Sequence, residues 1–331
     1  MRAGLICSLM LAAAIMPSAA FADSVTVTHA KGELTLDGVP QKVAVFDLAS
    51  LDIIDALGVD AVAGVPKSED GSFNAPAYLS KYADGKYVGV GTLFEPDIEA
   101  LKALKPDLII IAGRSSRQYD AVKDIAPTVD LSPAGEGLVA DGIKTTRTLG
   151  EIFHVEEKAS AEIAQLNASV DALHSAAPQN AKALVLFAVG ENFMPHAPGA
   201  RFGTLYDYIG LASVMEPYVA PARTDASARK RPEPGSPEAE AARKKQIEAR
   251  DSALAQSPDW IVTLDRGAIS SPEPSDIAQR LEKVETVTAT PAWKAGQVIH
   301  LDPRAWYLVG SGIQNLTNTA KDITLQFAEN K

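Results

Sequence analysis

The clearest structural pattern of this chain lies in Val90-Gly-Thr-Leu-Phe-Glu-Pro-Asp-Ile-Glu-Ala-Leu-Lys-Ala-Leu-Lys-Pro-Asp-Leu-Ile-Ile-Ile-Ala-Gly-Arg114. It predicts a loop, a short amphipathic helix, a Lys-Pro-Asp turn and a buried strand that ends before an arginine. The second half of the pattern returns in Ser252-Ala-Leu-Ala-Gln-Ser-Pro-Asp-Trp-Ile-Val-Thr-Leu-Asp-Arg266. Two such units indicate two equivalent lobes. Because open α/β sheets bind ligands outside the carboxyl ends of their strands, we expect an anion-binding cleft between the lobes.

Strands and helices alternate along the chain. The sequence predicts strands over residues 43–46, 108–112 and 128–131, and helices over 51–57 and 97–104. Residues 155–177 form a long helical segment, with apolar side chains at three- and four-residue steps, that stops at Pro178. We therefore predict an α/β fold of two Rossmann-like lobes with parallel sheets, joined by this single long helix, with a ligand cleft between the lobes.

The predicted domains follow from this pattern. They are an N-terminal lobe at 23–154, the linking helix at 155–178, and a C-terminal lobe at 179–331 that contains a charged insertion at 222–250. A chain of 331 residues is longer than one compact core usually holds, which agrees with two lobes. We expect the protein to be a monomer.

The first 22 residues have the pattern of a secretory signal peptide. Arg2 gives a positive start, Leu5–Met16 is an apolar run too short to span a bilayer, and Ala20-Phe-Ala22 is a small-x-small cleavage site. Cleavage after Ala22 would remove Cys7, the only cysteine, and leave a mature chain without thiols or disulfides. No later segment has the length and apolar content of a membrane helix. We expect a soluble protein exported to the periplasm.

The charge balance argues against two classes of partner. The chain has 42 acidic and 31 basic residues, and its net charge is −11. This balance argues against binding to nucleic acid or to anionic lipid by charge alone, because both are polyanions. It still allows a local cationic pocket.

Three arginines are the first candidates for an anion site. Arg114 and Arg266 follow predicted strands, and Arg201 precedes a predicted helix start, where backbone amides also favour anions. Guanidinium groups stay charged, donate several hydrogen bonds and stack on aromatic faces, so they suit a flat anion. Arg117 is a second candidate for the role of Arg114. The alternative for each arginine is a surface ion pair with a neighbouring acid.

These features resemble the class III periplasmic substrate-binding proteins, which serve ABC importers of ferric siderophores, haem and cobalamin. The resemblance covers essentially the whole mature chain and is closest to binding proteins for catecholate siderophores. The matching motifs are Ile111-Ala-Gly-Arg114, Ala200-Arg-Phe-Gly203, Leu264-Asp-Arg266 and Leu301-Asp-Pro-Arg-Ala-Trp-Tyr-Leu-Val-Gly-Ser-Gly312. It implies a protein without enzymatic activity or cofactor that binds a ferric siderophore, of catecholate or mixed catecholate type, and delivers it to an inner-membrane ABC permease.

Two aromatic residues and a histidine are further ligand candidates. Phenolate is a hard donor for ferric iron, so Tyr307 could complete an unfilled coordination sphere. Some relatives pair this tyrosine with a histidine from a second-lobe loop, but residues 222–250 contain none. A hydrogen-bonding or packing role for Tyr307 is therefore favoured over iron ligation. Trp306 fits the core or a stacking contact with a catechol. His196, in a Pro-rich segment before Arg201, is expected to face the cleft.

Two acidic residues have a different implied role. Glu99 lies in Asp-Ile-Glu-Ala-Leu, and Asp251 is expected to start the equivalent helix of the second lobe. The resemblance implies that an acid at each position docks onto arginines of the permease. The Asp251 side chain is shorter than the family's usual glutamate. The alternative is an ordinary charge on a solvated helix face.

Two other functions remain open at this point. A haem- or cobalamin-binding protein of the same fold would use Tyr307 or His196 as an axial ligand. An exported α/β enzyme is the third hypothesis, but the sequence has no Gly-x-Ser-x-Gly elbow, Walker loop or His-Glu-x-x-His site. The converging histidines and carboxylates of a zinc or manganese site are also missing from the sequence pattern.

Overall fold

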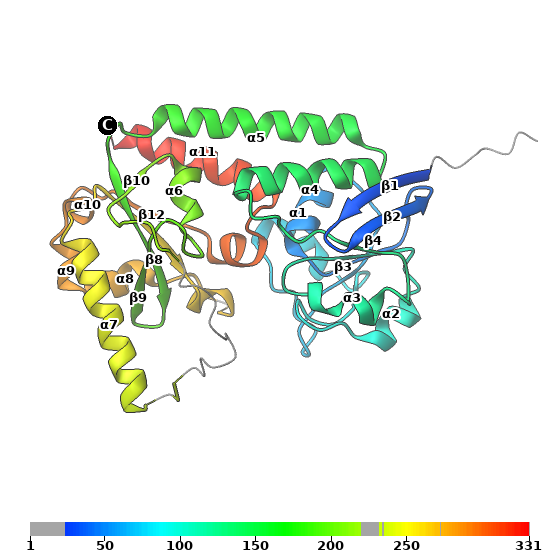
Figure 1. Ribbon diagram of the computed structural model, residues 1–331, viewed down its shortest axis with the longest axis horizontal. Helices are drawn as coiled ribbons and strands as arrows, with labels where there is room; N and C mark the ends of the chain where they lie inside the picture. Colours follow the sequence, from blue (N-terminus) through cyan, green and yellow to red (C-terminus); the bar gives the residue numbers. More distant parts are fainter. Residues whose placement is uncertain (1–23, 220–231, 234, 272, 331) are drawn as a thin grey trace, which may run out of the picture.

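The computed structural model describes residues 24–219, 232–233, 235–271 and 273–330, and it has two α/β lobes (Figure 1). The parallel sheet of the first lobe has the strand order β5-β4-β3-β6-β7. Its strands are β3 (Val43–Val45), β4 (Val62–Val65), β5 (Val88–Gly89), β6 (Leu108–Ile111) and β7 (Thr128–Asp130). Its helices and helical turns are α1 (Leu48–Ala56), η1 (Ala77–Ala83), α2 (Ile98–Leu104), η2 (Ser116–Gln118), α3 (Tyr119–Val122) and α4 (Leu138–Ile152). Strands β3, β6 and β7 are buried throughout, as expected for a parallel sheet covered on both faces.

A hairpin precedes this sheet. Strand β1 (Ser24–His29) pairs antiparallel with β2 (Gly32–Asp37), and alternation places Val27 and Leu36 in the core. The hairpin turn lies against β7, the edge strand, because the Ala30 amide donates to the Asp130 carbonyl oxygen at 2.9 Å. The turn thus satisfies an edge group that the sheet leaves unpaired.

The second lobe has parallel strands in the order β10-β8-β11-β12, and β9 pairs antiparallel with β8. Its strands are β8 (Lys182–Val189), β9 (Asn192–His196), β10 (Ala212–Ser213), β11 (Trp260–Asp265) and β12 (Val298–His300). Its helices and helical turns include α6 (Thr204–Ile209), α7 (Pro237–Leu254), η4 (Gly267–Ile269), α8 (Ile277–Glu282), α9 (Glu285–Thr288) and α10 (Pro291–Lys294). The π-helical turn η5 (Ala305–Val309) follows β12.

Two long helices connect the lobes. Helix α5 (Glu156–Ala176) is the predicted linking helix, and α11 (Ile313–Glu329) packs along it, as Figure 1 shows. The amides of Gln314 and Asn315 at the start of α11 donate to the buried carboxylate of Asp52 on α1, at 2.8 and 3.1 Å. The predicted fold of two α/β lobes joined by a long helix is confirmed, and α11 adds a second connection.

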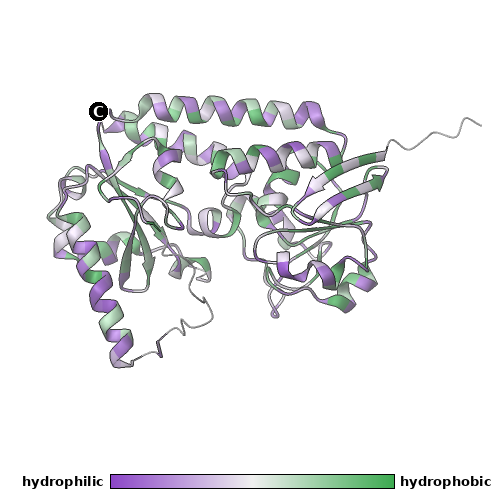
Figure 2. Cartoon of the chain, in the orientation of Figure 1, coloured by the Kyte–Doolittle hydropathy of each residue, from purple (hydrophilic) through white to green (hydrophobic). Residues whose placement is uncertain are grey.

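The segment predicted as a charged insertion is partly outside the described residues. Where it is described, Ser236 caps α7 by accepting from the Ala239 amide, with Pro237 in the first turn. Helix α7 is mostly hydrophilic (Figure 2) and packs against β9. The predicted signal peptide, residues 1–22, lies outside the described residues. Within the described ranges, none of the helices combines the length and hydropathy that a membrane span requires.

An arginine-lined cleft as the candidate binding site

A cavity of about 440 Å³ opens between the lobes, and its lining residues come from both of them. Asp47 and Arg114 belong to the first lobe, while Arg201, Phe202 and Tyr307 belong to the second. A ligand is expected at this position, because open α/β sheets bind ligands outside the carboxyl ends of their strands.

Three of the predicted arginines converge on Tyr307, which lies on the π-helical turn η5. The guanidinium carbons of Arg201, Arg114 and Arg266 lie 4.7, 5.5 and 5.7 Å from the centre of the Tyr307 ring. The Nε of Arg266 also donates to the Tyr307 hydroxyl at 3.4 Å. The structure therefore brings together, from four separate segments, the side chains that the sequence proposed one by one.

Each arginine is held by the end of an element. Arg114 follows β6 through Ala112 and Gly113, and Arg266 directly follows β11. Arg201 lies in the turn that precedes α6. Arg201 and Arg266 are exposed, whereas Arg114 is half-buried.

Arg114 makes a contact between the lobes. Its Nη1 donates to the Leu308 carbonyl oxygen at 3.3 Å, and its Nη2 donates to the Tyr307 carbonyl oxygen. Burial lowers the pKa of Arg114, although the nearby Asp47 carboxylate acts in the opposite direction. An arginine remains charged even so, and Arg114 therefore adds a fixed positive charge to the cleft.

The neighbouring arginines change the pKa of Tyr307. Burial alone would raise its pKa, but hydrogen bonds from Arg266 and Arg201 and their positive charges outweigh that effect and lower the pKa. The ring is stacked on Phe187, with centroids 6.1 Å apart and an interplanar angle of 10°. Arg114 and Arg201 line the cavity, and Arg266 lies beside it in contact with Tyr307. Together they place three cations next to aromatic faces, which suits a flat, polyanionic ligand.

His196 lies behind the lining instead of in it. Its ring packs edge-on against Phe202 and Phe187, with centroids 5.2 and 5.7 Å away. Its Nδ1 is buried and has no hydrogen-bond partner among the described residues. Burial lowers the pKa of His196, and the Arg201 charge acts in the same direction. The expectation that His196 faces the cleft is not met, because the predicted loop is strand β9, whose register turns the ring toward Phe187.

Trp306 and Arg117 differ in their relation to the cavity. Trp306 borders it but is buried, packs edge-on against Tyr208 and donates from Nε1 to Thr319 Oγ1 at 3.2 Å. It therefore serves mainly to pack η5. Arg117 is exposed on η2 and is not among the lining residues, so the structure favours Arg114 at this position.

The two predicted docking acids are in different environments. Glu99 lies in the first turn of α2 with 84% of its side chain exposed, and it pairs only with Lys102, at 3.0 Å, among the described residues. Asp251 is in the last turn of α7, so the expectation that it starts a helix is wrong. The helix begins 14 residues earlier because Ser236 and Pro237 form its cap. Asp251 accepts hydrogen bonds from Arg250 and Thr286, at 2.9 and 2.8 Å.

Several residues in and around the cleft were not predicted from the sequence. Phe202 lines the cavity and belongs to the Ala200–Gly203 motif, but it was not proposed as a lining residue. Phe187, which stacks on Tyr307 without lining the cavity, looked like any apolar strand residue. Asp47 directly follows a predicted buried strand, which was an available signal. Within the described residues no group of three or more potential metal-ligating His, Cys, Asp or Glu side chains occurs.

Two parallel α/β lobes around a cationic cleft define a solute-binding protein of the two-lobed class. The chain matches the family described as periplasmic binding protein over residues 43–305, and it belongs to this family. It is 32% identical to the petrobactin-binding protein YclQ of Bacillus subtilis, over 91% of this chain and 87% of that protein. It is 29% identical to the ferric-anguibactin-binding protein FatB of Vibrio anguillarum, over 90% and 86%. The crystal structure of the periplasmic catecholate-siderophore binding protein VctP from Vibrio cholerae superposes with a TM-score of 0.73, at 29% identity, covering 92% of this chain and 100% of that one.

Proposed function

We propose that this protein captures a ferric siderophore with catecholate groups in the cleft between its lobes. The convergence of Arg114, Arg201 and Arg266 on Tyr307 is the observation that carries this proposal. A ferric tris-catecholate complex spreads negative charge over flat aromatic rings, and guanidinium groups match both its charge and its π faces. The similar proteins named for petrobactin, anguibactin and catecholate siderophores support the same ligand class.

The protein acts as a carrier without enzymatic activity or a resident cofactor. After export through the signal peptide at residues 1–22, the monomer would carry its cargo in the periplasm to an inner-membrane ABC permease. Glu99 on the first lobe and Asp251 on the second would face that permease. Tyr307 holds Arg266 and offers its ring to the ligand, and iron ligation by its phenolate is the alternative.

Tryptophan fluorescence tests the ligand class, because Trp306 borders the cavity. The purified protein is titrated with ferric complexes of 2,3-dihydroxybenzoate, acetohydroxamate and citrate. We expect saturable quenching by the catecholate complex, with an affinity at least about tenfold higher than for the others. Tighter binding of the hydroxamate or citrate complex would overturn the assignment. A Soret band in protein purified from haem-containing cells would favour haem instead.

A further inference from the structure

Each lobe has a buried aspartate at the carboxyl end of a strand, next to its arginine loop. Asp130 ends β7 and is 0% exposed, and Asp265 ends β11 and is 3% exposed. We propose that Asp130 and Asp265 are positioning residues that fix the loops of Arg114 and Arg266 for the ligand. This inference rests on the proposed function only in assigning the anionic ligand to those arginines.

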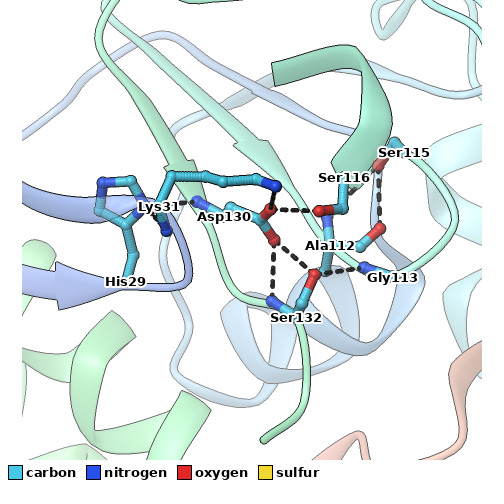
Figure 3. Close-up of polar contacts among 8 residues, drawn as sticks. All are labelled: His29, Lys31, Ala112, Gly113, Ser115, Ser116, Asp130 and Ser132. Carbon is cyan, nitrogen blue, oxygen red and sulfur yellow. Dashed lines mark hydrogen bonds and ion pairs between the residues drawn. The ribbon is translucent and has the colours of Figure 1, made fainter. Parts of the chain in front are cut away.

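In the first lobe, hydrogen bonds link Asp130 directly to Ser116 and, through Ser132, to Gly113 (Figure 3). The Asp130 carboxylate accepts from the Oγ atoms of Ser116 and Ser132, both at 2.5 Å, and from the Ser132 amide at 3.0 Å. The Ser132 Oγ accepts in turn from the Gly113 amide at 2.8 Å. Because Gly113 precedes Arg114 and Ser116 follows it by two residues, one carboxylate fixes the loop at both ends.

The N-terminal hairpin supports Asp130 from the other side. The Asp130 amide donates to His29 Nδ1 at 3.2 Å, and Lys31 Nζ lies 4.0 Å from the Asp130 carboxylate, as Figure 3 shows. A buried charge without such partners would be strongly unfavourable. The hairpin therefore places a lysine beside the carboxylate that accepts hydrogen bonds from both serines, and it holds the backbone of Asp130.

The second lobe has an equivalent arrangement. The Asp265 carboxylate accepts from the Gly267 amide at 2.9 Å and from Ser275 Oγ at 2.6 Å, and it forms an ion pair with Arg280. Arg280 also donates to the Gly190 carbonyl oxygen, in the turn between β8 and β9. Asp265 and Gly267 flank Arg266, so the carboxylate again fixes the backbone on both sides of the arginine.

Neither carboxylate lines the cavity between the lobes. The two carboxylates therefore affect the ligand indirectly, because they preorganise the loops that carry Arg114 and Arg266. An exposed arginine on a loosened loop must lose more conformational entropy when it binds, so the affinity falls although every ligand contact is still available.

Small substitutions test this without removing a buried charge. Ser116→Ala with Ser132→Ala releases the first loop, and Ser275→Ala removes one bond to Asp265. Ser132→Thr and Ser275→Thr keep the hydroxyl. Ser175→Ala is the control, because Ser175 Oγ donates to the Asp171 carbonyl oxygen on α5 and to no other group among the described residues. The ligand probe is the ferric complex of 2,3-dihydroxybenzoate, titrated by tryptophan fluorescence.

A second measurement needs no ligand. Tyr307 lies beside all three arginines, so displacement of Arg114 or Arg266 should raise the pKa of its phenol. Ultraviolet difference titration reports this pKa when each variant is compared with the same variant carrying Tyr307→Phe. We expect the alanine variants to bind the probe about three- to tenfold more weakly and to raise the phenol pKa, with a melting temperature close to that of Ser175→Ala.

The outcomes separate this inference from the proposed function. A phenol pKa that is raised in the alanine variants and restored by threonine supports the positioning role. This holds even if the wild-type protein does not bind the probe, because that result would contradict only the proposed ligand. An unchanged phenol pKa in both sets of alanine variants overturns the positioning role. Equal weakening by alanine and threonine would also overturn it, because the hydroxyl bonds would then be irrelevant.

Discussion

At the scale of single residues, the main feature of the cleft is the group of three arginines around the Tyr307 ring. Arg201 and Arg266 lower the pKa of the phenol, and the ring gives their guanidinium groups a π face in the absence of ligand. The arginines are thus held in position before binding, and their positive charge is concentrated around one aromatic ring. This arrangement suits planar anions, whose rings can stack on the guanidinium groups.

Replacing any of these arginines should weaken ligand binding. Each charge-assisted contact contributes about 1.5–3 kcal/mol, so Arg114→Ala, Arg201→Ala and Arg266→Ala should each raise the Kd for a ferric catecholate by about one to two decades. Lysine should restore only part of the affinity, because it lacks the planar guanidinium. Arg117→Ala is the control, since Arg117 is exposed and outside the lining. Wild-type affinity in all three alanine variants would place the pocket elsewhere.

His196 should make the stability of the fold depend on pH. Its pKa in the folded protein lies below the ordinary value of 6.5, so the unfolded chain binds the proton more tightly. The contribution is fully present above about pH 6.5 and is lost as the pH falls toward the folded-state pKa. Urea unfolding at pH 7.5 and pH 5 should show a smaller loss on acidification in His196→Phe than in the wild type. An equal loss in both would mean that His196 does not titrate in this range.

At the scale of elements, the sequence predicted the strands that carry the arginines but missed α4. Helix α4 contains Gly142 and Gly150, which weaken a helical signal. The structure explains both glycines by close packing: a Cβ at Gly142 would lie 2.6 Å from the Ser311 carbonyl oxygen, and one at Gly150 would lie 2.7 Å from the Ala159 Cβ. A contact with a segment as distant in sequence as Ser311 cannot be inferred from local propensity.

The residues of the candidate site could be predicted from the sequence, but their convergence could not. Arg114 and Arg266 follow predicted strands, and Arg201 precedes a predicted helix. Tyr307 lies in a motif that carries the family resemblance, so all four residues could be proposed from the sequence. Their convergence depends on how η5 crosses between the lobes, and no local pattern encodes that. The position of His196 was mispredicted because Pro195 suggested a loop, although proline is tolerated in an edge strand such as β9.

The start of α2 should contact the permease through Glu99. Glu99→Lys should leave ferric catecholate binding intact in purified protein and greatly reduce uptake in cells, because like charges across an interface are strongly penalised. Asp120→Lys is a matched control, since Asp120 is 86% exposed and also pairs with a lysine three residues on. Asp251→Lys should reduce uptake less, because Asp251 is already engaged by Arg250 and Thr286. Normal uptake with Glu99→Lys would make Glu99 an ordinary solvated acid.

At the scale of the whole molecule, two long helices connect the lobes. Helices α5 and α11 pack along each other, and Asp52 on α1 holds the first turn of α11. Arg304 adds a further contact between lobes, from its Nε to Asn74 Oδ1 at 3.1 Å. These ties favour small changes in cleft width over a wide hinge motion.

Asp52 should therefore be important for stability. Its carboxylate accepts from Tyr78, Gln314 and Asn315, and its removal would leave buried donors without partners. We expect Asp52→Ala to lower the free energy of unfolding by about 2–4 kcal/mol, measured by urea denaturation. Asp37→Ala, at an exposed position, should change it by less than about 0.5 kcal/mol. Equal effects of the two substitutions would show that the Asp52 contacts do not stabilise the connection.

The most direct test of ligand binding in this cleft is the position of the iron. Crystals grown with a ferric catecholate complex, measured at the iron absorption edge, give an anomalous difference peak at the metal. We predict a single strong peak between the lobes, surrounded by Arg114, Arg201 and Arg266 and next to the Tyr307 ring. A peak outside this cleft, in protein that binds the complex in solution, would contradict the account.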